Sequence, residues 1–143
     1  MATALNEATR RLVDDPNFAV VATINPDGSP QQSVVWVKRE GDNVLFTTTE
    51  HRRKGRNLAR DPRVGILIVD PDDPYRYVEI RGRAQLTPDP DNALGNQLSH
   101  EYLGEDAPRG ARLGSPRCRA GGRRQAHGPR GRRLRCHACH VFA

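Results

Sequence analysis

The segment EHRRKGRNLARDP, residues 50–62, carries the charge pattern best suited to binding chemistry in this chain. Arg52, Arg53 and Lys54 stand where a helix is predicted to begin, although the N-terminus of a helix carries about half a positive charge. Three threonines, residues 47–49, end the predicted strand before them. Hydroxyls at a strand end, free amides at a helix start and consecutive cations together favour an anion site, because a bound phosphate turns repulsion into attraction.

The same cations have a second interpretation. They could form a solvated basic patch that pairs with the flanking acids Glu50 and Asp61. The segment is neither a Walker loop nor a dinucleotide fingerprint, since no glycine-rich turn between a strand and a helix precedes it. These residues alone leave the phosphate site and the solvated patch open.

The net charge of +6 comes entirely from the C-terminal part of the chain. Residues 1–108 hold 13 of the 23 basic residues and all 17 acidic residues, a net charge of −4. Residues 109–143 hold ten arginines, no acid, all three cysteines and three of the five histidines. The basic character therefore does not describe the domain that precedes this tail.

Three interpretations compete for the tail. An arginine-rich arm for RNA or DNA would lack the usual interleaved aromatic residues. A zinc site could be assembled from Cys118, Cys136, Cys139 and His140, although their spacing is loose. A shifted reading frame accounts for the abrupt change at residue 109, because GC-rich codons read out of phase give Arg, Gly, Ala, Pro, Cys and His. We favour the shifted frame, so we expect a disordered or frameshift-derived tail, no strand from it, no metal site and no nucleic-acid partner.

The remaining composition favours one domain over residues 1–108 followed by the tail. No apolar run approaches the roughly 20 residues that span a bilayer. Residues 1–17 lack the basic start and apolar middle of a signal peptide. We therefore expect a soluble, cytoplasmic protein with no membrane partner.

Tight turns separate short apolar runs over most of the domain. The turn sequences NPDGSP and GDN predict hairpins, and Gly82 suggests a bulge. Five or so strands with helices only at the margins predict a mainly β (α+β) domain, a small antiparallel barrel that would normally need one more strand to close. The predicted helices are 3–15, the start of 50–62, and 90–104, and the predicted strands are 18–24, 31–40, 44–50, 64–70 and 75–88.

Three stretches in this order carry a family resemblance: FAVVATINPDGSPQQSVVW, LFTTTEHRRKGRNLARDPRVGILIVDPDDPYRYVEIRGRAQL and LSHEYLGEDAP. Over about residues 10–108 the chain resembles the pyridoxamine 5′-phosphate oxidase-like flavin/deazaflavin reductases, and more narrowly the branch that uses coenzyme F420. The resemblance implies a split β-barrel of the FMN-binding type with short flanking helices. It also implies a homodimer with two cofactor sites, each at the subunit interface.

The resemblance also implies which residues bind the cofactor. The threonines and cations would hold its phosphate with support from an asparagine, the start of the second strand would line the deazaflavin ring, and two tyrosines of the partner subunit would wall the pocket. Alternatively, the second-strand residues could be a plain exposed face, and the tyrosines could simply fill the dimer interface. The implied residues are Thr47, Thr48, Thr49, Arg52, Arg53, Lys54 and Asn57; Pro30, Gln31 and Ser33; and Tyr75 and Tyr77.

The implied activity is hydride transfer between reduced F420 and an unsaturated small molecule of unknown identity. No Ser/His/Asp or Cys/His arrangement occurs in the matched region, His51 and His100 are isolated, and Trp36 is predicted to be an apolar anchor. No catalytic residue is predicted, which agrees with a family in which the cofactor carries the redox chemistry. FMN in place of F420, or a non-enzymatic carrier of deazaflavin, flavin or haem, are the alternatives.

The sequence departs from the resemblance at its end. Members of the branch continue after the YLGEDAP region into a last strand rich in Val and Ile, where this chain has the arginine-rich tail. Without that strand a sheet edge would be exposed, and we expect an unstable or inactive protein.

Overall fold

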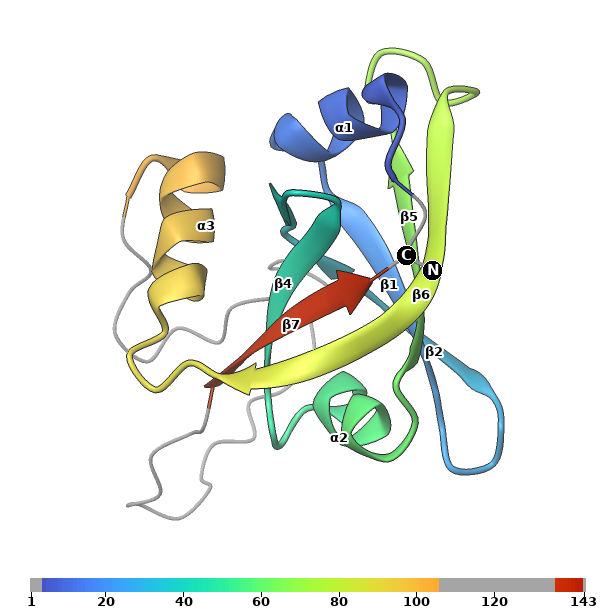
Figure 1. Cartoon of the computed structure of the whole chain (residues 1–143), viewed down its shortest axis with the longest axis vertical. Helices are drawn as coiled ribbons and strands as arrows, with labels where there is room; N and C mark the ends of the chain where they lie inside the picture. The colour runs from blue at the N-terminus through green and yellow to red at the C-terminus, as the bar shows by residue number, and fades with distance from the viewer. Residues whose placement is uncertain (1–3, 106–135, 143) are drawn as a thin grey trace, which may run out of the picture.

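The computed structural model describes residues 4–105 and 136–142. Within them, seven strands form one antiparallel sheet in the order β2-β1-β5-β6-β7-β4-β3, and the sheet curls into a half-barrel (Figure 1). The helices are α1 (Glu7–Asp14), α2 (Arg53–Arg60) and α3 (Ala93–Leu103). The strands are β1 (Ala19–Ile24), β2 (Pro30–Val35), β3 (Lys38–Glu40), β4 (Asn43–Thr49), β5 (Arg63–Val69), β6 (Tyr77–Pro88) and β7 (Cys136–Phe142).

The three helices cover different parts of the curled sheet. Figure 1 shows α1 and α2 at opposite ends of the half-barrel, with α3 beside β4. Leu94 and Leu98 of α3 pack on Leu45 of β4 and Ala138 of β7, which form a small second core outside the barrel. None of the described helices is both long enough and apolar enough to cross a lipid bilayer.

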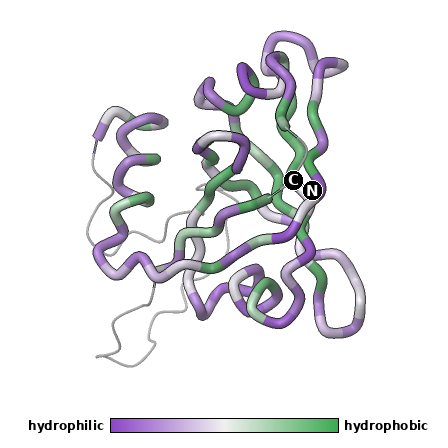
Figure 2. Tube along the Cα trace, viewed as in Figure 1, coloured by the Kyte–Doolittle hydropathy of each residue, from purple (hydrophilic) through white to green (hydrophobic). Residues whose placement is uncertain are grey.

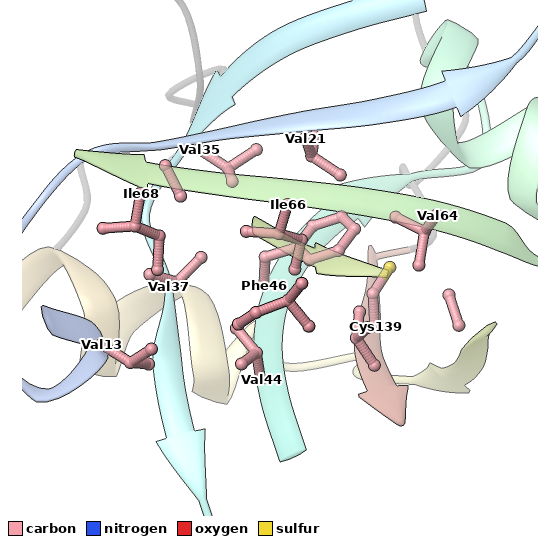
Figure 3. Packing of buried hydrophobic residues seen from close by; sticks show 14 of the residues in the cluster. Val13, Val21, Val35, Val37, Val44, Phe46, Val64, Ile66, Ile68 and Cys139 are labelled. Carbon is pink, nitrogen blue, oxygen red and sulfur yellow. The ribbon is translucent and has the colours of Figure 1, made fainter. Parts of the chain in front are cut away.

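The main core lies inside the barrel because the strands alternate inward and outward side chains. Val44 and Phe46 of β4 point inward, as do Ile66 and Ile68 of β5, and each of these four is at most 1% exposed. Figure 3 shows Phe46 in the middle of this cluster, with Cys139 of β7 entering from one side. Figure 2 shows the hydrophobic segments gathered along the central strands and the hydrophilic ones on the turns and helix surfaces.

The strand predicted over residues 31–40 is two strands, β2 and β3. The chain leaves the sheet at Trp36 and Val37, where Tyr102 of α3 replaces a strand neighbour. The Tyr102 hydroxyl accepts a hydrogen bond from the Val37 amide (3.2 Å) and lies within bonding distance of the carbonyls of Asn17 (2.7 Å) and Val37 (3.1 Å). Its ring stacks on Trp36 at a centroid distance of 5.4 Å. The break between β2 and β3 therefore depends on Tyr102, which is 65 positions away from Val37 in the sequence.

The bulge suggested at Gly82 is wrong. Residues Arg63–Val69 of β5 pair without interruption with β6, and Gly82 lies directly opposite Val64. On its other side, β6 pairs with β7 from Arg83 onward. A glycine with no side chain to pack is accommodated here in regular pairing.

The expectation that the tail supplies no strand is also wrong for its last residues. β7 fills the gap between β4 and β6 and pairs with both. Every second side chain, Cys139 and Val141, is fully buried in the barrel core, so this short stretch has the alternation of a core strand. Residues 106–135 lie outside the described part, and the frameshift origin and the domain boundary at residue 108 stay predictions.

Candidate anion-binding site at the start of helix α2

Helix α2 is pressed against the end of β4 at Gly55. A Cβ atom at this position would lie 2.2 Å from the carbonyl oxygen of Thr49 and 3.4 Å from the Thr48 methyl group. The Arg52 amide also donates to the Thr49 carbonyl oxygen at 3.1 Å. Only glycine fits without a shift of the backbone, and the first turn of α2 is thereby held beside the last residues of β4.

The first turn of α2 has no internal counter-charge. Arg52 occupies the N-cap position without a side-chain capping bond, and the turn that follows contains no acidic residue. The first amides of a helix have no acceptor within the helix, and its dipole is positive at this end. The predicted helix start is confirmed, and its electrostatics favour an anion.

Lys54 is the cation that the fold turns inward. Its side chain is 4% exposed, and its Nζ atom donates to Ser33 Oγ of β2 at 3.0 Å. Burial, and then the nearby charge of Arg52, lower the pKa of Lys54 from 10.5 to about 8. Among the described residues no carboxylate forms an ion pair with this ammonium, so the fold holds a buried positive charge that an anion would neutralise.

Asn57 fastens α2 to the β1–β2 hairpin. It is 1% exposed, and its Nδ2 atom donates to Thr23 Oγ1 and to Asn25 Oδ1, both at 3.0 Å. The Thr23 hydroxyl in turn donates to Gln31 Oε1 at 2.9 Å. Asn57, predicted to support the turn, and the half-buried Gln31 thus belong to one hydrogen-bond network. This network holds the hairpin against the helix.

The three threonines do not all face the same space. Thr48 points into the barrel with Val44 and Phe46 and is 4% exposed, whereas Thr47 and Thr49 alternate to the other face and are half-buried. Thr48 Oγ1 is fully buried and has no hydrogen-bond partner among the described residues. The predicted convergence of hydroxyls is therefore partial, and Thr48 is the inward member.

The two arginines lie nearer to solvent than Lys54. Arg52 is half-buried and Arg53 is exposed. Bonds from Ser29 and, more weakly, the charge of Arg53 hold the pKa of Asp27 below its usual value, which places Arg53 near the β1–β2 turn. Pro30 is exposed at the beginning of β2.

The acids that could have neutralised a solvated basic patch make other contacts. Asp61 forms an ion pair with Arg63 at 2.8 Å, and this bonding lowers the pKa of Asp61 to about 2. Glu50 lies 3.4 Å from His51 Nε2. These contacts favour the anion-site interpretation of the helix start.

Tyr75 and Tyr77 lie at the other end of the protomer. They are 91% and 62% exposed and follow β5 on the side of α1, away from α2 (Figure 1). With α1 they border a hollow of about 820 Å³. The tyrosines therefore do not meet the basic site within one chain.

Reasoning from the sequence missed three residues of the site. Thr23 interrupts the apolar strand FAVVATI at an inward position, and Gly55 stands inside a helix, two signals that could have been noticed. Asn25 belongs to the predicted turn NPDGSP, a position that gives no signal of its bond to Asn57. No group of three metal-binding side chains gathers in residues 4–105 and 136–142. Cys118, a ligand of the zinc alternative, lies outside them.

The curled antiparallel sheet and the helix docked at its end define a split β-barrel of the flavin-binding type, as predicted. The chain belongs to the pyridoxamine 5′-phosphate oxidase family, whose model matches residues 5–120. The resemblance stated from the sequence is thereby confirmed.

The individual relatives and solved structures carry different names. A pyridoxine/pyridoxamine 5′-phosphate oxidase of Neisseria meningitidis serogroup C is 32% identical over 112 residues, 78% of this chain and 49% of that protein. A solved F420 reductase is 29% identical with a TM-score of 0.73, and the match covers 96% of this chain and 94% of that one. A heme binding protein from Mycobacterium smegmatis, 19% identical with a TM-score of 0.58 over 97% of this chain and 53% of that one, shows the shared fold alone. The chain spans about half the length of the curated relatives it matches.

Proposed function

We propose that this protein is an oxidoreductase that binds coenzyme F420 with a phosphate group at the start of α2. One observation carries the proposal: the buried ammonium of Lys54 lies beside an uncapped helix start that lacks any acid. A phosphate there would satisfy the helix amides and the ammonium together. The resemblance to a solved F420 reductase over nearly the whole of both chains supports the choice of cofactor.

The residues of this chain would bind and orient the cofactor. Lys54 and Arg52 would neutralise the phosphate of the cofactor. Pro30, Gln31 and Ser33, at the start of β2, would border its ring. Reduced F420, when bound, would supply a hydride to an electron-poor double bond of a small molecule and would be left oxidised, and solvent would supply the proton that balances the reaction. Asn57 holds the hairpin and helix in place through its two bonds.

FMN is the second candidate cofactor. It also carries a phosphate, so the basic helix start fits it equally well, and the curated relatives named as oxidases support this choice. A carrier that binds either cofactor without turning over a substrate would use the same contacts.

We further propose that two copies assemble through the outer face of β2, β1, β5 and β6. Val34, Val20 and Leu67 lie opposite one another on three adjacent strands, and Val69 lies opposite Tyr77 on the next pair. Four of these five side chains are 36% to 62% exposed, which is unusual for a contiguous apolar row on a monomer. A second copy on this face would bury the row and bring the partner's tyrosines toward a site they cannot reach within one chain.

The cofactor proposal is tested by titrating the purified protein with F420 and, separately, with FMN, while following fluorescence. Wild type is compared with Arg52→Ala/Lys54→Ala and with Arg63→Ala, which removes an exposed arginine at the start of β5, beyond the end of α2. Hydrogen bonds to charged groups contribute roughly 1.5–3 kcal/mol each. We therefore expect the double variant to weaken binding at least tenfold and the control to leave it unchanged.

Each result has a definite meaning. Tight F420 binding that weakens only in the double variant supports the proposal, and tight FMN binding with the same pattern moves the protein to the flavin branch. If the double variant and wild type bind the cofactor with equal affinity, the phosphate does not bind at the start of α2. For the dimer, light scattering should show a molecular mass that falls by half in Leu67→Glu, and a wild-type monomer would refute that assembly.

A further inference from the structure

Two buried polar atoms on neighbouring strands at the end of the barrel have no hydrogen-bond partner among residues 4–105 and 136–142. They are Thr48 Oγ1 on β4 and His137 Nδ1 on β7, and both atoms are out of contact with solvent. Among the described residues no other buried side-chain nitrogen or oxygen is left without a bond. Buried polar atoms are nearly always paired, so two unpaired ones on directly opposed residues point to a hydrogen-bond acceptor that the described residues do not supply.

We propose that His137 is a further ligand-binding residue, which together with Thr48 binds one phosphate oxygen of the cofactor. The proposal rests on the function proposed above and adds a residue to the same site. It comes from β7, within the arginine-rich tail, where the family resemblance places no cofactor-binding residue.

The strand register places the two side chains together. Thr48 and His137 are direct partners in the antiparallel pairing of β4 with β7. Side chains directly opposite in such a pair lie on the same face of the sheet with their Cβ atoms about 4.5–5.5 Å apart. Cys139 and Val141, two and four residues further along β7, point into the barrel, and so does Phe46 on β4. The alternation therefore turns both Thr48 and His137 inward.

The same space adjoins the cations of α2. The Thr48 methyl group lies 3.4 Å from the position that a Cβ of Gly55 would occupy, in the first turn of the helix. Lys54, the residue before it, lies near enough to Cys139 on the inward face of β7 for its charge to oppose the rise in the pKa of that thiol. The threonine hydroxyl, the imidazole and the buried ammonium thus belong to one end of the barrel.

The donor chemistry suits an anionic oxygen. The Thr48 hydroxyl can donate one hydrogen bond, and His137 donates from Nδ1 in the tautomer that carries its proton there. An oxygen with two lone pairs that accepts from both would satisfy two buried atoms at once. Phosphate offers such oxygens, and Lys54 supplies the opposite charge.

The test uses the full-length protein and two shape-conserving substitutions, Thr48→Val and His137→Phe. Thr87→Val on the exposed part of β6 is the matched control. Affinity for F420 and for FMN is measured by fluorescence titration, and the stability without cofactor is measured by thermal unfolding. We expect each of the first two variants to weaken binding about tenfold, with the double variant losing little more because both groups bind one oxygen.

The stability measurement separates a ligand contact from a structural role. Thr48→Val removes a buried hydroxyl that has no partner, so its melting temperature without cofactor should equal or exceed that of wild type. A clear fall would show that the hydroxyl is bonded within the folded chain and would overturn the proposal. If His137→Phe fails to fold, His137→Asn keeps a polar atom near the Nδ1 position and should retain more affinity than His137→Leu.

Failure of this inference is distinguishable from failure of the proposed function. Wild-type affinity in Thr48→Val and in the folded His137 variant, together with weak binding in Arg52→Ala/Lys54→Ala, would exclude His137 and leave the phosphate site intact. Absence of F420 and FMN binding by folded wild type would overturn both proposals. Weakened binding in both sets, with Thr87→Val unchanged, supports both.

Discussion

Replacing Lys54 by methionine should change how the free energy of unfolding depends on pH. In the folded chain the buried ammonium has a pKa of about 8, against 10.5 for an ordinary lysine. Below pH 8 the side chain is charged in both states, and the folded state bears the full cost of burying that charge. Between about pH 8 and 10.5 the folded chain releases the proton while the unfolded chain keeps it, so the free energy of unfolding rises with pH.

The size of the effect follows from the two pKa values. One pH unit between them corresponds to about 1.36 kcal/mol, so the full separation is worth at most roughly 3 kcal/mol. Lys54 is almost completely buried, and its hydrogen bond to Ser33 Oγ does not provide a counter-charge. Methionine has a similar length and no charge, so the variant should be at least as stable as wild type at pH 7 and should lose this advantage by about pH 10.

The assay is urea denaturation of wild type and Lys54→Met at intervals from pH 7 to pH 10, without cofactor. The quantity to compare is the difference in free energy of unfolding between the two proteins. Burial raises the pKa of the Cys139 thiol to about 12, which lowers stability above pH 9. Burial acts alike in both proteins, so only the smaller effect of the Lys54 charge on this thiol differs between them. If the difference in free energy of unfolding between the two proteins does not change with pH, Lys54 does not carry a buried charge that lacks a counter-charge.

Two further substitutions and one labelling experiment test the packing of the fold. Gly55→Ala should lower the free energy of unfolding by about 1–3 kcal/mol, because its methyl group would overlap the Thr49 carbonyl oxygen; an unchanged urea midpoint would mean that α2 does not press on β4. Tyr102→Phe should cost about 1–2 kcal/mol through the hydrogen bonds that it loses at the β2–β3 break, and Tyr75→Phe, at an exposed position, should cost nothing measurable by the same assay. Cys139, in a variant whose other two cysteines are serine, should react with a thiol reagent only after unfolding, since the thiolate is the reactive form and burial raises its pKa to about 12; rapid labelling of the native protein would contradict its position in the core.

Local patterns were sufficient for most elements of the domain. The apolar run at residues 18–24 and the turn sequence after it predict the β1–β2 hairpin, and Gly28 in the turn has a positive φ of 84°. The basic segment begins a helix at the predicted place, and residues 90–104 contain α3. These features depend on neighbouring residues in the chain, so periodicity and turn chemistry are enough to find them.

Site residues were predicted less completely, because their roles depend on which face of an element they occupy. The sequence predicts a role for the threonine run as a group, but strand alternation turns Thr48 inward and its two neighbours away. It likewise predicts a role for the three cations as a group, yet of these only Lys54 is buried. A run of like residues in a sequence does not reveal the direction of each side chain until the strand or helix is placed against its neighbours.

The sequence by itself determined the family, the split-barrel class and the position of the basic helix start, because local periodicity and motif order carry that information. Only the tertiary structure decided that Cys136–Phe142 completes the sheet between β4 and β6 and sets His137 opposite Thr48. The physical reason is that strand pairing is non-local. Two open edges brought together by the rest of the barrel can recruit a short alternating stretch, CHACHVF, whose cysteines and histidines do not by themselves indicate a core strand.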